Sequence, residues 1–175
     1  MINNTLSNEG GLPQVRRGTS TSTGASPAND AAGNVPQFIA VVAAAGGGLQ
    51  LHQISEVTAA AAEAALKQAI SNQDVILATI AADRFQGMVA SIGRDCRSKT
   101  GEKQFVSLCA FGPIVTLIEA QALNAPLVGS AIEKAIAGLG RYICTLPAAD
   151  LRLAAHYFTA SSGDAVVQIQ GAGLN

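Results

Sequence analysis

Charged positions in the first half of the chain repeat with a helical spacing. Four charged side chains between residues 55 and 74 fall within about 20° of one another when the chain is wound as a helix. They are Glu56, Glu63, Lys67 and Asp74. The rest of the segment is nearly all alanine, which favours helix. This pattern predicts a helix that begins near Ser55 and breaks at residues 71–72, followed by a second helix from about Gln73 to Arg94.

Residues 104–123 are apolar on every side of a helical projection. A helix that is hydrophobic all round is buried in a core, an interface or a bilayer. The pair Gly112–Pro113 is expected to kink or interrupt it, because proline lacks the backbone N–H that a helix needs.

Two further helices are predicted after residue 124. The sequence Asn124-Ala-Pro126 starts a new element, and Ser130 and Glu133 have the spacing of a capping box for a helix that runs to about Tyr142. Pro147 suits the first turn of a last helix. Its expected buried face consists of Leu151, Ala154, Ala155 and Phe158.

Short apolar runs near residues 38–43, 49–53 and 165–170 have β character. The first two are joined by Gly46-Gly-Gly48 and predict a hairpin, although a helix through Ala45 is nearly as compatible with the pattern. The third run needs a partner, which either this hairpin or the same strand of a neighbouring subunit could supply. The overall expectation is a mainly α-helical bundle or elongated helical domain, with about four to five helices and a small β element.

A change in composition divides the chain. Residues 1–35 are rich in Asn, Gly, Ser and Thr, and they bury too little apolar area to offset the entropy of ordering. We expect a disordered or arm-like N-terminal segment over 1–35 and a single helical domain over 36–175.

Composition points to a covered surface. The chain is 49% hydrophobic, 4% aromatic and 13% charged, which leaves few charges for the outside of a globule. Some apolar surface should therefore contact copies of the chain, another protein or a lipid. The formal net charge is −1 and the basic residues near Arg94 to Lys103 alternate with acidic ones, so a nucleic-acid partner is not expected.

No catalytic, metal or cofactor site is predicted. The histidines and cysteines do not have zinc-ligand spacing. Cys109 and Cys144 suit small buried apolar positions, Cys96 an exposed thiol, and His156 a structural or exposed position. No secretory signal or transmembrane helix is evident, which favours a cytoplasmic protein or one exported by a signal-independent route.

These features together predict a non-enzymatic, self-assembling structural subunit of a filament, shell or lattice. The expected interface residues are Phe105, Leu108, Phe111, Ile114, Val115 and Ile118, with Ile2, Leu6, Leu12 and Val15 of the arm. One alternative is a membrane-active or secreted helical protein that inserts residues 105–132 as an apolar hairpin. Another is a small enzyme with a cysteine nucleophile.

Overall fold

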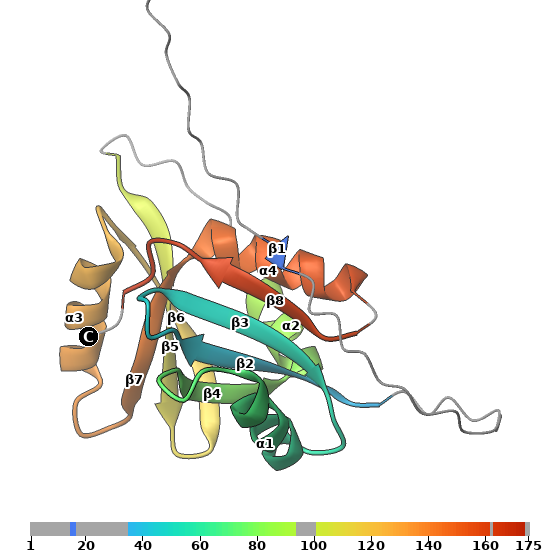
Figure 1. Cartoon of the computed structure of the whole chain (residues 1–175). Helices are drawn as coiled ribbons and strands as arrows, with labels where there is room; N and C mark the ends of the chain where they lie inside the picture. The colour runs from blue at the N-terminus through green and yellow to red at the C-terminus, as the bar shows by residue number, and fades with distance from the viewer. Residues whose placement is uncertain (1–14, 17–34, 94–100, 162, 174–175) are drawn as a thin grey trace, which may run out of the picture.

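β-Sheets form the framework of the protein. The computed structural model describes residues 15–16, 35–93, 101–161 and 163–173, which form two antiparallel sheets with four helices packed on them (Figure 1). One sheet has the strand order β1-β8-β3-β2-β4 and the other β6-β5-β7. The expectation of a mainly α-helical fold is therefore wrong, and the chain is mixed α/β.

The elements follow one another along the chain with short connections. The strands are β1 (Val15–Arg16), β2 (Gln37–Ala43), β3 (Leu49–Ser55), β4 (Val75–Ala81), β5 (Lys103–Phe111), β6 (Ile114–Ala122), β7 (Arg141–Pro147) and β8 (Ala165–Ile169). The helices are α1 (Ala59–Ala69), α2 (Ala82–Ala90), α3 (Ala125–Ala135) and α4 (Ala148–Ala160).

The β predictions are confirmed. β2 and β3 form the expected antiparallel hairpin, and Gly47 and Gly48 in its turn have φ values of 85° and 90°, which glycine adopts readily. The alternative helix through Ala45 is wrong. The predicted strand near the C-terminus is β8, and it pairs with β3 of this hairpin.

The first predicted helix is confirmed over Ala59–Ala69, but its expected start near Ser55 lies in β3, and the second helix is wrong. α1 starts after Thr58, whose side chain accepts a hydrogen bond from Ala61 N–H, and it ends before the predicted break at residues 71–72. Residues 73–94 are not one helix, because Val75–Ala81 forms β4, which pairs with β2. α2 then follows β4 with no intervening loop.

The predicted apolar helix over residues 104–123 is a β-hairpin. β5 and β6 pair along their whole length, and Gly112–Pro113 is the two-residue turn between them, with a φ of 60° at Gly112. Five successive residues of β5, Phe105 to Cys109, are buried, so both faces of this strand are covered. A strand that is buried on both faces is apolar at nearly every position, which explains why its sequence resembles a buried helix.

The prediction for the last helix is confirmed, whereas the predicted bounds of the helix before it are wrong. α3 begins after Asn124, whose side chain caps Leu127 N–H, and ends at Ala135, so the expected start at Ser130 and the extension to Tyr142 are wrong. α4 begins directly after Pro147 and buries the four residues predicted for its inner face.

The two halves of the chain repeat one topology. The order β2-β3-α1-β4-α2 recurs as β5-β6-α3-β7-α4, and in both halves the first strand lies between the other two. Each of the last three elements of the second half begins 66 residues after its counterpart: Ala125 after Ala59, Arg141 after Val75 and Ala148 after Ala82. Both central strands change register toward their third strand, between Val41 and Val42 and between Leu108 and Cys109.

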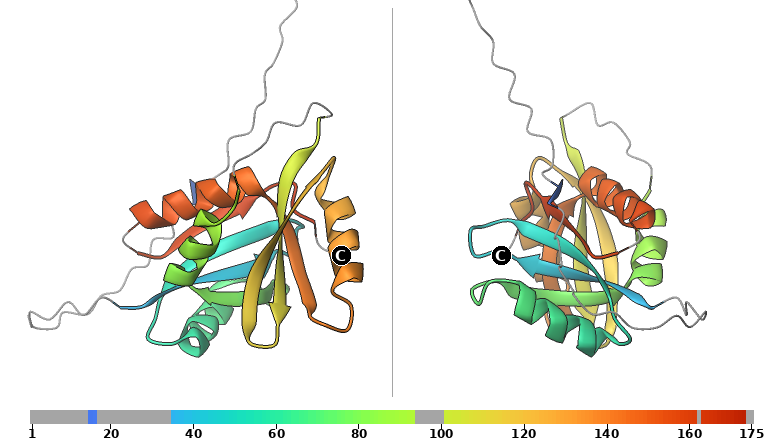
Figure 2. Two further views of the ribbon diagram at one scale, coloured as in Figure 1. Left: turned by 180° about the vertical axis from the view of Figure 1, so that it is seen from behind. Right: turned by 45° about the vertical axis from the view of Figure 1, so that its right-hand side comes forward.

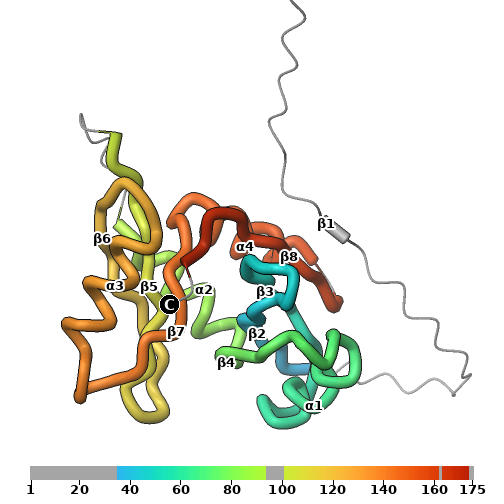
Figure 3. Tube along the Cα trace, turned by 60° about the vertical axis from the view of Figure 1, so that its left-hand side comes forward, coloured from blue at the N-terminus to red at the C-terminus, as the bar shows by residue number. Residues whose placement is uncertain are grey.

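A shared core lies between the halves. α2 contacts α4 (Figure 2). The rings of Phe85 and Phe158 meet edge to face with centroids 6.4 Å apart. The buried residues of these two helices join those of both sheets in one cluster. α1 covers the other face of the first sheet and α3 that of the second, each with a smaller apolar cluster, so the helices α1 and α3 lie at opposite sides of the molecule (Figure 3).

Candidate functional site

Strand β6 forms one edge of the three-stranded sheet. It pairs with β5, and no other strand lies against its outer side in the part of the chain that the structure describes. Of its nine residues, only Glu119 is charged. A long, largely apolar edge strand is a template for pairing with another chain, and natural sheets usually block such edges with charges, prolines or covering loops.

Every second residue of β6 points its backbone N–H and C=O groups away from β5. The carbonyl oxygen of Val115 accepts a hydrogen bond from Arg84 Nη2 at 3.0 Å, so it points away from β5. Because backbone direction alternates along an antiparallel strand, the N–H and C=O groups of Leu117 and Glu119 point to the same side. Arg84 therefore covers one end of the edge. No described strand pairs with Leu117 at its centre.

The side chains of β6 are incompletely buried. Ile114 is 53% exposed, and Val115, Leu117 and Ile118 are half-buried. Val115 and Leu117 pack against the shared core from its margin. An additional strand at this edge would remove more of their apolar surface from water, which is favourable by about 25 cal/mol per Å².

A polar cluster lies near the other end of the edge. Both carboxylate oxygens of Glu119 accept hydrogen bonds from Gly93 N–H at 3.1 Å, and one also accepts from Gln104 Nε2 at 2.8 Å. Arg152 of α4 donates to Gln104 Oε1 at 3.0 Å and to the Gly93 carbonyl. The donors and acceptors of the cluster thus bond one another, so it fastens the segment that follows α2 to the second sheet.

The structure separates the residues that were predicted to form a subunit interface. Phe105 and Leu108 are 3% and 0% exposed and lie inside the core of the chain itself, whereas Phe111 is half-buried. The three residues that lie on the edge strand are Ile114, Val115 and Ile118. Val15 lies in β1, and Ile2, Leu6 and Leu12 lie outside the described residues.

Sequence reasoning missed Leu117 and Arg84 as parts of this edge. It treated residues 104–123 as a helix, in which Leu117 has no special position. The available signal was Gly112–Pro113 between two apolar runs, which is also the pattern of a hairpin with a short turn.

A buried group of hydroxyls joins β5, β7 and the C-terminal segment. Ser107 Oγ and Thr145 Oγ1 are 2.7 Å apart, and Tyr142 OH donates to Thr145 Oγ1 at 2.9 Å and lies 3.0 Å from the carbonyl oxygen of Gly173. Burial raises the pKa of the Tyr142 hydroxyl. These contacts and the backbone bridge between Thr145 and Gly173 hold the C-terminal segment on β7.

The two described cysteines are buried thiols, as the sequence predicted. Burial raises the pKa of Cys109, and burial together with the neighbouring Cys109 raises the pKa of Cys144 to about 12. Because the thiolate is the nucleophilic form, neither residue is suited to covalent catalysis at neutral pH. Cys96 lies outside the described residues.

The histidines occupy different environments. His156 on α4 is exposed, one of the two positions predicted for it. His52 is half-buried, with Nε2 3.0 Å from Gln50 Oε1, and burial lowers its pKa while Asp74 acts in the opposite direction. Among the described residues, no three His, Cys, Asp or Glu side chains converge as metal ligands.

One groove of about 850 Å³ lies where α3 and α4 begin. Lys103, Glu102 and Asp150 are among its lining residues. Burial raises the pKa of Asp150, and Lys103 opposes that shift. Acidic and basic groups line the same groove, so its charge does not define a ligand class.

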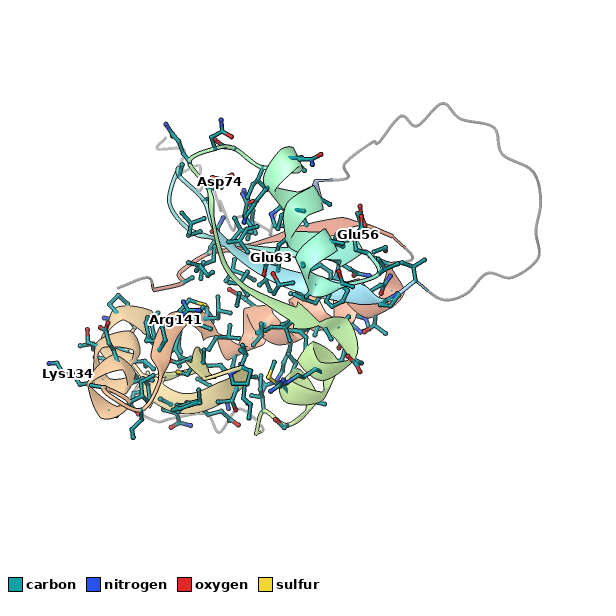
Figure 4. All side chains as sticks on the ribbon, turned by 90° about the horizontal axis from the view of Figure 1, so that it is seen from below. Glu56, Glu63, Asp74, Lys134 and Arg141 are labelled. Atoms are coloured by element: carbon teal, nitrogen blue, oxygen red, sulfur yellow. The ribbon has the colours of Figure 1, made fainter. Side chains whose placement is uncertain are left out.

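Charged side chains are divided between the two halves. Figure 4 shows Glu56, Glu63 and Asp74 around α1, with Lys134 and Arg141 on the α3 and β7 side of the molecule. Some of these groups also have structural roles, since Arg141 Nη2 donates to the Leu77 carbonyl at 3.2 Å.

Comparisons with protein-family models, curated proteins and solved structures find no match for this chain. The described helices are also too short or too polar to cross a membrane. The edge of β6 is therefore the candidate functional site on the evidence of its own geometry.

Proposed function

We propose that this protein is a non-enzymatic structural subunit that assembles with copies of itself, and that the edge of β6 is one of its contact surfaces. The observation that supports the proposal is the outer side of β6, where a nine-residue strand with one charge has no neighbouring strand among the described residues. Backbone hydrogen bonds across such an edge provide affinity, and the alternating side chains provide specificity.

The apolar surface elsewhere on the chain supports the same function. Several large apolar side chains are about half exposed or more, on both halves of the molecule. Outside α4 they are Val35, Val57, Val75, Ile114, Leu123, Leu127 and Leu139. Scattered exposed residues are normal in a monomer, but here they accompany an open edge and a low charged fraction of 13%.

Sedimentation velocity over low to high micromolar concentrations tests this function. We expect the weight-average sedimentation coefficient to rise with concentration, because association follows mass action. A single monomeric species throughout this range would refute self-assembly. The substitution Ile118→Lys, which places a charge in the centre of the edge, should shift the equilibrium toward monomer. The matched control is Leu153→Lys, which makes the same change at an exposed position on α4.

A further inference from the structure

The repeated topology makes β3 and β6 equivalent strands, but among the described strands β3 has a partner on its outer side and β6 has none. β3 lies between β2 and β8, whereas β6 has β5 on one side and no described strand on the other. The two strands can therefore be compared position by position, with Leu49, Leu51 and Gln53 of β3 corresponding to Val115, Leu117 and Glu119 of β6.

Reciprocal contacts support this equivalence. Gln53 Nε2 of β3 donates to the carbonyl of Ser161, which directly follows α4 of the other half, at 3.5 Å. Its counterpart Glu119 of β6 accepts from Gly93 N–H, in the segment that follows α2 of the other half. Each half thus holds the end of the other half's last helix with the same position of its second strand, as expected for two units related by an approximate twofold axis.

Burial differs between the equivalent strands in the way that a missing strand would cause. Leu49, Leu51 and Gln53 are 1%, 0% and 1% exposed, with β8 beside them. The corresponding Val115 and Leu117 are only half-buried, and Glu119 is exposed. In the part of the chain that the structure describes, the sheet of the second half therefore has no counterpart of β8, the strand that covers β3 in the first half.

We propose that the N-terminal arm of a second copy, residues 1–34, supplies this strand, pairing antiparallel with residues 115–119 of β6 and taking the place of Arg84 at the Val115 carbonyl. The register is that of β8 on β3, where Ile169 lies opposite Leu49 and Ala165 opposite Gln53. The strand's outermost residues would thus lie opposite Val115 and Glu119. This inference rests on the proposed function, since it specifies how two copies of the chain join.

The position of α2 favours a single extended segment over the edge of another folded sheet. α4 packs against β8 in the first sheet, so its equivalent α2 lies where it would pack against a strand added to β6. The contact from Arg84 of α2 to Val115 shows that this helix already reaches the edge. A second folded sheet would bring its own covering helix to the same side, whereas an arm has none.

The arm has the required length and pairing behaviour. Its 34 residues precede the described start of the folded region at Val35, and an extended chain of this length spans up to about 110 Å. Val15–Arg16 within it forms β1, which pairs antiparallel with the outer side of β8. Val15–Arg16 is thus already the edge strand of the five-stranded sheet.

A fluorescent peptide of residues 1–34, added to the dilute full-length protein, tests the inference. We expect saturable binding to the wild type and to Leu153→Lys, and binding weaker by at least roughly tenfold, or about 1.4 kcal/mol, to Ile118→Lys. A peptide with the same composition in scrambled order should not bind. Equal binding to Ile118→Lys, or no binding to the wild type, would overturn the inference.

Amide exchange on the wild type provides a readout that needs no substitution. Saturation with the arm peptide should slow exchange of the outward N–H groups of Leu117 and Glu119, while amides bonded to β5, such as Ile118, change little. Unchanged exchange at Leu117 would refute pairing at this edge. If the protein assembles in sedimentation but does not bind the peptide, the arm is not the added strand and the proposed function still holds. If the protein is a monomer at every concentration, the proposed function itself is refuted.

Discussion

The two equivalent threonines Thr79 and Thr145 should respond in opposite ways to the same substitution. Thr145 lies opposite Ser107 in the second sheet, and their hydroxyl oxygens are 2.7 Å apart. Thr79 lies opposite Ala40 in the first sheet, and its buried hydroxyl has no hydrogen-bond partner. Valine has nearly the shape of threonine without the hydroxyl, so it isolates the contribution of that group.

Thr79→Val should stabilise the protein and Thr145→Val should destabilise it. A buried polar group without a partner costs about 1–3 kcal/mol, so its removal at Thr79 recovers up to that amount. Replacement of Thr145 removes the partner of Ser107, which is 0% exposed, and one of the two contacts of Tyr142. The expected loss is again about 1–3 kcal/mol.

Urea unfolding measures both effects, provided that the m-values remain equal. In a chain of this size, each kcal/mol corresponds to a shift in Tm of about 2–4 °C. Ala40→Ser is a third variant, which gives the Thr79 hydroxyl the partner that Thr145 has and should also stabilise. Combined with Thr79→Val, it should lose this gain because the new hydroxyl then has no partner. Changes of the same sign at Thr79 and Thr145 would refute the reasoning.

Three further outcomes are expected. Gly140→Ala should destabilise by about 1–3 kcal/mol in urea unfolding, because the added Cβ would lie 2.8 Å from a β5 carbonyl oxygen, whereas Gly87→Ala in α2 meets nothing within 4 Å and should stabilise by about 0.5–1 kcal/mol. The lowered pKa of His52 means that the unfolded chain binds a proton more readily, so stability should fall as the pH drops below about 6.5, and His52→Gln should reduce this slope in pH-dependent unfolding. Alkylation at neutral pH, followed by peptide mapping, should leave Cys109 and Cys144 unmodified until the protein unfolds, and rapid modification in the folded state would contradict their burial.

The sequence predicted two elements whose boundaries carry turn chemistry, although Gly112–Pro113 was not predicted to be the turn of a hairpin. Gly46 to Gly48 separates β2 from β3, and Pro147 marks the start of α4, and both features are found where they were expected. By contrast, β4 continues into α2 at residues 81–82 without glycine, proline or a polar loop. The helical spacing of α2 therefore extends backward over β4 in the sequence, and one long helix was predicted.

Burial on two faces hid the second sheet from sequence analysis. β5 contacts the shared core on one side and the α3 cluster on the other. Its sequence therefore lacks the alternation of polar and apolar residues that marks a strand with one exposed face. The internal repeat was hidden for a related reason. Equivalent buried positions keep apolar character but not identity, as with Phe85 and Leu151, which both lie in the shared core. The candidate edge was consequently predicted only in part, through Ile114, Val115 and Ile118, and without knowledge that they form a strand.

The pairing of β8 with β3 has a consequence for the chain during its synthesis. β8 leaves the ribosome after the other described strands, and it pairs with β3 in the sheet that contains β2, which is made much earlier. Until residues 165–169 emerge, β3 has the same kind of unpaired edge that β6 has among the described strands. A nascent chain, or one that ends before β8, therefore exposes two unpaired strand edges at once. Nonsense mutations upstream of Ala165 should produce aggregation in the cell instead of a shortened soluble product.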